Sequence, residues 1–76
     1  MSKLSIGSCI RERRKTLSVT QSDLAGLASV SVNTLYKIEK GQANPTLAVL
    51  DKIAAILGME LNIGLIEINT VDNAGS

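Results

Sequence analysis

The segment 20–41, TQSDLAGLASVSVNTLYKIEKG, constrains the fold of this chain more than any other feature. It contains two short runs of helical periodicity, each preceded by a capping residue, Thr20 for the first and Ser31 for the second. The apolar positions that we expect to face a core are Leu24, Ala25, Leu27, Ala28, Leu35 and Ile38. A turn of three residues joins the two runs, so the helices must cross steeply, with the small Ala25 where their backbones approach.

Helices are also predicted on both sides of this pair. The first should follow Ser5 and run to about Thr16, and the fourth should begin after Thr46 and end at Gly58. Their expected core positions are Ile6, Ile10 and Leu17 in the first helix, and Leu47, Leu50, Ile53, Ala54 and Leu57 in the fourth. The predicted fold class is therefore mainly α, with four helices in one domain over residues 1–58.

After Gly58 the sequence begins to alternate between apolar and polar residues. This alternation favours a β-strand over residues 59–68, MELNIGLIEI, although Leu61, Leu65 and Ile68 also fit the spacing of a fifth helix. A single strand cannot satisfy its own backbone hydrogen bonds, so we expect it to pair with the same strand of a second copy in a homodimer. Residues 69–76 are polar and are expected to form a flexible tail.

The composition argues against several classes of function. The 76 residues, enough for one domain, contain one cysteine, Cys9, and no histidine, so an internal disulfide is excluded and a zinc site is not expected. Without a Gly-rich phosphate loop or clustered carboxylates, we expect no enzyme, no metal and no cofactor. Because the apolar runs are short and interrupted by charge, no membrane span is expected and the chain should be cytoplasmic. We expect Cys9 to be a half-buried thiol on the first helix.

The net charge of +1 hides two halves of opposite charge. Residues 1–40 carry seven basic and three acidic residues, whereas residues 41–76 carry one basic and four acidic residues. Binding to phosphates requires a local positive potential and does not require a basic chain overall. The N-terminal half therefore suits a polyanionic partner.

The turn and its flanks, IRERRKTLSVTQSDLA and YKIEKGQANPTLAVLDKIAAILG, resemble the helix-turn-helix of the phage Cro/CI repressors and related small regulators of the XRE family. The resemblance covers about residues 4–58. It implies a sequence-specific DNA-binding transcriptional regulator, a repressor that binds a pseudo-palindromic operator of double-stranded DNA as a homodimer. It also implies an ion pair between Arg14 and Glu39, and a Gln21 that binds phosphate and braces the recognition helix. Where relatives favour glycine in the turn, this chain has Ser29, which would need a positive φ.

The second helix of the pair carries the side chains that the resemblance assigns to base recognition. Asn33 can bind adenine through two hydrogen bonds, Val32 and the methyl group of Thr34 can contact a thymine methyl, and Lys37 can reach guanine or a phosphate. Tyr36, the only aromatic residue, either faces the groove or is a solvated or dimer-packing side chain. The residues expected to contact DNA, including phosphate partners, are Thr20, Gln21, Ser31, Val32, Asn33, Thr34, Tyr36, Lys37, Lys40, Gln42 and Asn44.

The strand predicted at 59–68 adds a more limited resemblance, to the HipB-type antitoxins. Those proteins dimerise through a shared C-terminal strand pair and bind both their own operator and a kinase-like toxin. An antitoxin that mainly neutralises a toxin is therefore one alternative, and a solitary or phage-type regulator is another. The candidate dimerisation residues are Val49, Ile56, Leu61, Ile63 and Leu65.

Overall fold

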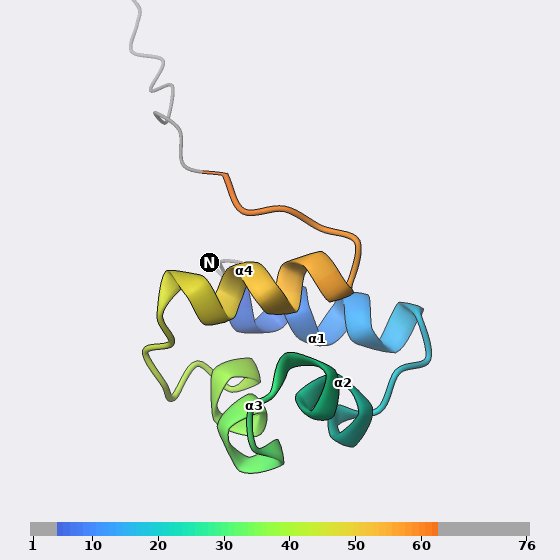
Figure 1. Cartoon of the computed structure of the whole chain (residues 1–76), viewed down its shortest axis with the longest axis horizontal. Coiled ribbons are helices and arrows are strands. Elements are labelled where there is room, and N and C mark those ends of the chain that lie inside the picture. The colour runs from blue at the N-terminus through green and yellow to red at the C-terminus, as the bar shows by residue number, and fades with distance from the viewer. Residues whose placement is uncertain (1–4, 63–76) are drawn as a thin grey trace, which may run out of the picture.

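The computed structural model describes residues 5–62, which form four α-helices. The helices are α1 (Ile6–Thr16), α2 (Gln21–Ala28), α3 (Val32–Glu39) and α4 (Leu47–Ile56). Helices α1 and α4 lie above α2 and α3 (Figure 1), and α1 packs mainly against α3 while α4 packs mainly against α2. The four predicted helices are confirmed, and their bounds agree closely with those expected from the sequence.

Each helix begins with the hydroxyl cap that its sequence predicts. The side-chain oxygens of Ser5, Thr20, Ser31 and Thr46 each accept a hydrogen bond from the backbone N–H three residues later, at 3.0 to 3.1 Å. Such a cap stabilises a helix by about 1 kcal/mol. Helices of 8 to 11 residues are too short to be stable alone, so these caps and the tertiary packing have to stabilise them together.

The core lies where the four helices meet, and four of its side chains are completely enclosed, Leu24, Leu35, Ile53 and Leu57. The rest of the buried apolar set is Ile10, Ala25, Ala28, Ile38, Leu50 and Ala54. Val19 and Val30, which precede the caps of α2 and α3, are half-buried and pack against this core. Ala25 is 1% exposed, as expected at the crossing of α2 and α3.

Several predicted core positions are wrong. Leu27 and Leu47 are each 64% exposed, and Ile6 and Leu17 are also exposed. Leu27 precedes the buried Ala28 by one residue and lies off the buried face of α2. The other three residues lie at the ends of α1 and α4, outside the crossing of the helices.

Two further expectations about exposure are also wrong. Val49 and Ile56, expected to lie away from the core, are half-buried and pack partly against it, while their role in dimerisation stays a prediction. Cys9 is exposed instead of half-buried.

The turns require unusual backbone conformations at four positions. Ser29 has the positive φ that the sequence implied, +58°, and ends α2 in the left-handed conformation. Gly41 and Gly58 follow α3 and α4 with φ of +75° and +72°. Ser18, between α1 and α2, also has φ of +58°, which no feature of the sequence predicted.

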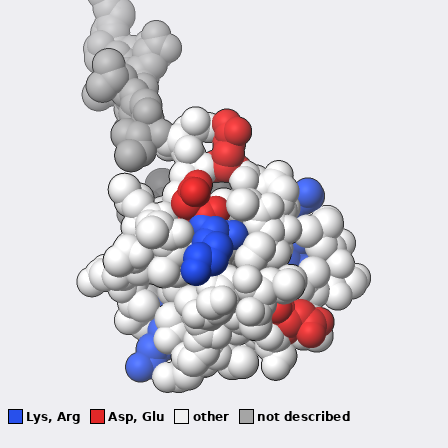
Figure 2. All heavy atoms as spheres, in the orientation of Figure 1, with Lys and Arg blue, Asp and Glu red and all other residues white. Residues whose placement is uncertain are grey.

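The face over which α4 runs is largely uncharged. Near the middle of this face a basic group adjoins acidic groups, and uncharged surface separates them from the other charged groups (Figure 2). The visible side of α4 therefore offers no continuous basic surface to a polyanion.

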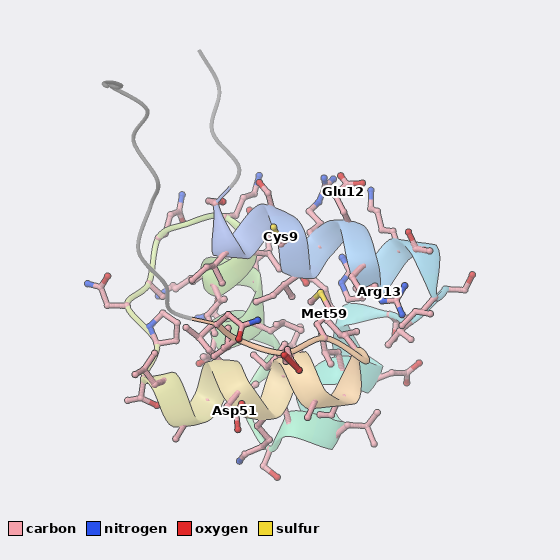
Figure 3. The ribbon with its side chains drawn as sticks, turned by 90° about the horizontal axis from the view of Figure 1, so that it is seen from above. Cys9, Glu12, Arg13, Asp51 and Met59 are labelled. Carbon is pink, nitrogen blue, oxygen red and sulfur yellow. The ribbon has the colours of Figure 1, made fainter. Side chains whose placement is uncertain are left out.

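Two contacts fix α1 against its neighbours. Gly7 is buried, and a Cβ at this position would overlap the carbonyl oxygen of Ile38 and lie 2.7 Å from that of Glu39. The absence of a side chain at Gly7 therefore lets α1 approach the end of α3 closely. Arg13 reaches from α1 toward the end of α4, where its Nε donates to the carbonyl oxygen of Leu57 at 2.9 Å (Figure 3).

After Gly58 the chain runs without regular secondary structure through residues 59–62, and Met59 and Leu61 pack partly against the core. The predicted strand at 59–68 continues into residues 63–68, which lie outside the described residues, as do Ile63, Leu65 and the predicted tail. Within residues 5–62, no helix has both the length and the apolar character that crossing a membrane requires.

Candidate nucleic-acid interface

Helix α3 divides into a buried side and an exposed side. Leu35, Ile38 and Glu39 are buried, and the last two follow Leu35 by three and four residues, on the face toward α1 and α2. The five other residues, Val32, Asn33, Thr34, Tyr36 and Lys37, are all exposed. Even the two hydrophobic residues among them, Val32 and Tyr36, are 43% and 45% exposed. The side chains expected to read bases therefore share one solvent-facing surface.

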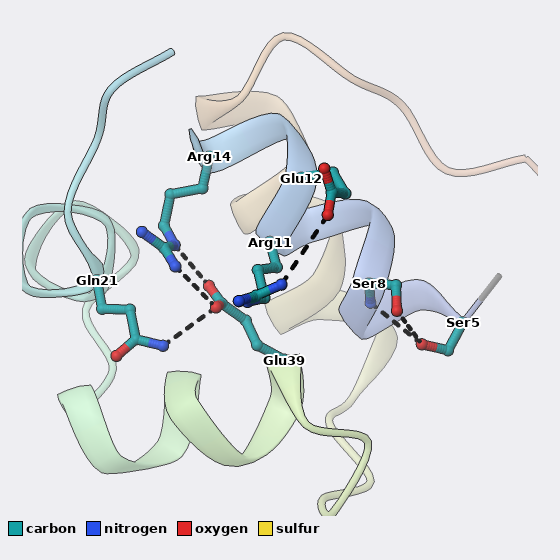
Figure 4. Close-up of polar contacts among 7 residues, drawn as sticks. All are labelled: Ser5, Ser8, Arg11, Glu12, Arg14, Gln21 and Glu39. Carbon is teal, nitrogen blue, oxygen red and sulfur yellow. Dashed lines mark hydrogen bonds and ion pairs between the residues drawn. The ribbon is translucent and has the colours of Figure 1, made fainter. Parts of the chain in front are cut away.

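A buried ion pair joins α3 to α1. Nε of Arg14 donates to Oε2 of Glu39 at 2.8 Å, and Nη2 donates to Oε1 at 3.0 Å, so the guanidinium grips both carboxylate oxygens (Figure 4). The Arg14 and Glu39 side chains are only 11% and 2% exposed. The hydrogen bonds to Glu39 raise the pKa of Arg14, although burial acts in the opposite direction. The ion pair that the resemblance implied is present.

Further hydrogen bonds extend this pair to α2 and to the loop before it. Nη1 of Arg14 donates to the carbonyl oxygen of Val19 at 2.9 Å. Nε2 of Gln21, the first residue of α2, donates to Oε1 of Glu39 at 3.1 Å (Figure 4). One carboxylate on α3 is therefore bonded to both α1 and α2, which fixes the orientation of α3 about its own axis. The expected bracing by Gln21 is present.

The ends of α3 hold the other expected contact residues at the surface. Ser31 caps the helix and also donates its hydroxyl hydrogen to Oγ1 of Thr34 at 2.8 Å, which orients the Thr34 side chain. Beyond the helix, Lys40, Gln42 and Asn44 are exposed, and Nζ of Lys40 lies 5.7 Å from the centre of the Tyr36 ring. Thr20 is also exposed and caps α2.

Beside α3 lies an open depression of about 310 Å³ that all three N-terminal helices line. Its lining residues are Arg11, Arg14 and Lys15 from α1, Gln21 from α2, and Tyr36, Glu39 and Lys40 at the end of α3. Four of these residues are basic and one is acidic, a net charge of +3. Arg11 and Lys15 were not among the residues expected from the sequence to contact DNA. Arg11 and Lys15 are four residues apart, and this spacing was the signal that they share one side of α1.

The described residues contain no grouping of His, Cys, Asp and Glu side chains that could hold a metal ion.

Comparison with known proteins agrees with this geometry. The model of the helix-turn-helix family HTH_3 matches residues 10–63. A protein of Methanothermobacter thermautotrophicus, described as an uncharacterized HTH-type transcriptional regulator, is 43% identical over 51 residues, 67% of this chain and 74% of the relative. An immunity repressor protein of Bacillus phage phi105 is 34% identical over 59 residues, 78% of this chain and 41% of the relative.

Some relatives are much longer than this chain. A protein of Methanococcus maripaludis that is named as an HTH-type transcriptional regulatory protein is 39% identical over 66 residues, 87% of this chain. The chain spans only 19% of the length of that relative. What it shares with such a protein is therefore one domain.

Solved structures give the same fold. The clp gene regulator ClgR from Corynebacterium glutamicum superposes with a TM-score of 0.71 at 27% identity, covering 72% of this chain and 58% of the other. SinR, the master regulator for biofilm formation, solved in complex with DNA, superposes with a TM-score of 0.67 at 35% identity, covering 74% of this chain and 90% of the other. The chain therefore belongs to the HTH_3 family of helix-turn-helix proteins and carries the DNA-binding domain of a Cro/CI-type transcriptional regulator.

Proposed function

We propose that this chain represses transcription by binding a pseudo-palindromic operator as a homodimer, with α3 in the major groove of each half-site. The observation that carries the proposal is the exposed face of α3, five residues held in a fixed orientation by the buried contacts of Glu39. A helix with its side chains is about 10–12 Å wide, which matches a major groove about 12 Å wide.

The exposed residues differ in the contacts that they offer to bases. The side-chain oxygen of Asn33 can accept a hydrogen bond from adenine N6 while its amide nitrogen donates one to adenine N7. This pair of bonds discriminates against other bases by about 1–3 kcal/mol. Val32 and the methyl group of Thr34 suit thymine methyl groups, while the Thr34 hydroxyl is already bonded to Ser31. Lys37 would reach guanine or phosphate, and Tyr36, with Lys40 beside its ring, would lie at the side of the groove.

Phosphate contacts would come from the surfaces around α3. The proposed partners are Thr20, Gln21, Ser31, Lys40, Gln42 and Asn44. Gln21 uses one amide hydrogen on Glu39, so its Oε1 and the remaining hydrogen are not required by that bond. The solved SinR complex supports DNA as the partner, and the name of the phage relative supports repression.

A homodimer follows from the symmetry of the proposed operator, because half-sites one helical turn apart need two recognition helices about 34 Å apart. Leu61 remains a candidate for the subunit contact, and the exposed Ile6 and Leu47 line a depression together with it. These two residues extend the candidate contact beyond those expected from the sequence. A regulator that binds chromosomal DNA acts where that DNA is, so we propose a cytoplasmic location.

Selection of bound sequences from a random DNA pool tests the proposal, since it reports binding, symmetry and half-site spacing together. Asn33→Ala should then weaken binding to the selected operator by about 5- to 150-fold, and leave binding to random DNA nearly unchanged. Asn44→Ala removes the same amide from a proposed phosphate contact and should weaken both equally. Equal losses on the two DNAs for Asn33→Ala in a gel-shift titration would refute the base-reading role.

A further inference from the structure

We propose that Arg11 and Lys15 of α1, together with Lys40, bind one backbone phosphate of each half-site, so that α1 itself contacts the operator. This inference rests on the proposed function and assigns the ligand of the basic depression beside α3. The depression joins these three residues although Arg11 and Lys15 are separated from Lys40 by more than twenty positions in the sequence.

The charge of the depression is set by its rim. Arg14 and Glu39 lie at the bottom and neutralise each other through two hydrogen bonds. The exposed basic groups are then Arg11, Lys15 and Lys40, and within the lining no carboxylate other than that of Glu39 opposes them. An anion at the rim therefore meets three positive charges that no lining residue neutralises.

The rim residues can turn toward such an anion. Arg11 has only a long contact with Glu12, 3.9 Å between Nη1 and Oε2, and these side chains are 49% and 74% exposed. Because water competes for so exposed a pair, Glu12 holds Arg11 weakly. Lys40 already lies over the ring of Tyr36 at the edge of the depression. Lys15 is exposed on the next turn of α1.

The position of the depression indicates a DNA phosphate as the anion. When a helix fills the major groove, the two phosphate backbones run along its sides, because helix and groove have nearly the same width. The depression adjoins Tyr36 and Lys40 on α3 and Gln21, the first residue of α2. The first turn of a helix also has N–H groups without helical partners, which favour a phosphate at the same edge. A backbone passing α3 on this side therefore lies over Arg11 and Lys15.

The test is the salt dependence of operator binding for Arg11→Gln, Lys15→Gln and the double variant. Each lost phosphate contact should reduce the slope of log affinity against log salt by about 0.9, so loss of the one proposed phosphate in both half-sites should reduce it by about 1.8. The fall in affinity between 50 mM and 200 mM salt should then become about 3.5-fold smaller for each lost contact. Lys52→Gln is the matched control, because it removes one exposed positive charge from α4, outside the depression. All these side chains are exposed, and circular dichroism checks that each variant folds as the parent does.

A second measurement separates a direct contact from a general loss of positive charge. Neutral methylphosphonates are placed one at a time along the selected operator. At one position in each half-site, the neutral group should weaken binding of the parent protein but not that of the double variant. The inference is overturned if the α1 variants have the same slope as Lys52→Gln. It is also overturned if, at every position, the methylphosphonate weakens binding of the double variant as much as binding of the parent. The proposed function survives either result as long as Asn33→Ala still loses discrimination. A parent protein that selects no sequence from the random pool overturns both the inference and the proposed function.

Discussion

Replacing Glu39 with glutamine tests whether the buried ion pair fixes α3 to the rest of the domain. The substitution keeps the size of the side chain and removes its charge. Glutamine retains one carbonyl oxygen as acceptor, but its amide group would face the guanidinium of Arg14, donor against donor. Because the Arg14 side chain is only 11% exposed, its charge would remain buried without a partner.

The expected cost is large for so small a domain. Breaking one partner of a buried pair typically costs about 3–5 kcal/mol. We expect about 3 kcal/mol here, because Glu39 Oε1 already shares its bonds with a half-buried Gln21 and because glutamine keeps one acceptor. A chain of this length is stable by only about 4–11 kcal/mol on average values per residue. The variant should therefore lose a large part of its stability.

Urea denaturation followed by circular dichroism measures the effect. With an m-value of about 1 kcal/mol/M, a loss of 3 kcal/mol lowers the midpoint by about 3 M urea. Glu12→Gln is the matched control: it removes the same charge from an exposed ion pair with a 3.9 Å contact, and it should change stability by less than about 1 kcal/mol. Adding Arg14→Met to Glu39→Gln should recover part of the loss, because it removes the unpaired charge.

Two results would refute this reasoning. If Glu39→Gln and Glu12→Gln shift the midpoint equally, the pair behaves as a surface contact and does not fix the orientation of α3. If the double variant is less stable than Glu39→Gln by the full effect of a second independent substitution, the unpaired charge is not the cause of the loss.

Two further predictions concern backbone positions. Gly7→Ala should destabilise the domain by about 1–3 kcal/mol, because the new Cβ overlaps the carbonyl oxygen of Ile38, whereas Gly26→Ala, with nothing within 4 Å, should stabilise it by about 0.5–1 kcal/mol; equal shifts in thermal midpoint would contradict the close approach of α1 and α3. Ser29→Gly should stabilise the domain by about 0.5–1 kcal/mol, because serine at φ of +58° is strained there, whereas Ser22→Gly inside α2 should destabilise it by about 0.5 kcal/mol; a destabilising Ser29→Gly in the same urea assay would show that the residue is not strained.

The parts of the fold that the sequence predicted are those with local causes. Each hydroxyl cap acts on an N–H three residues later, so Thr20, Ser31 and Thr46 mark the helix starts whatever else surrounds them. The inward positions Leu35 and Ile38 also follow from spacing, because α3 presents one narrow side to the core.

The errors have a tertiary cause. Apolar spacing does not indicate how far the core extends, so Leu47 at the start of α4 fits the pattern but lies beyond the neighbouring helices. Helix propensity alone makes Gly7 a weak point in the first turn of α1, whereas in the fold it permits the contact with Ile38 and Glu39. Arg11 and Lys15 fit a solvated helix face, and only the crossing of α1 and α3 brings them next to Lys40.

The division of labour within α3 has a consequence for specificity. Leu35, Ile38 and Glu39 hold the helix in place. Burial of an apolar side chain the size of Leu35 or Ile38 stabilises the fold by about 1.5–3 kcal/mol. The residues on the other side make few contacts with the rest of the domain, so changes there cost little stability. If α3 reads the operator, Asn33 and its exposed neighbours can therefore be replaced to alter the preferred sequence while the scaffold stays intact. Substituting Glu39 or Arg14 should instead weaken binding to every sequence, because the orientation of the whole helix is lost.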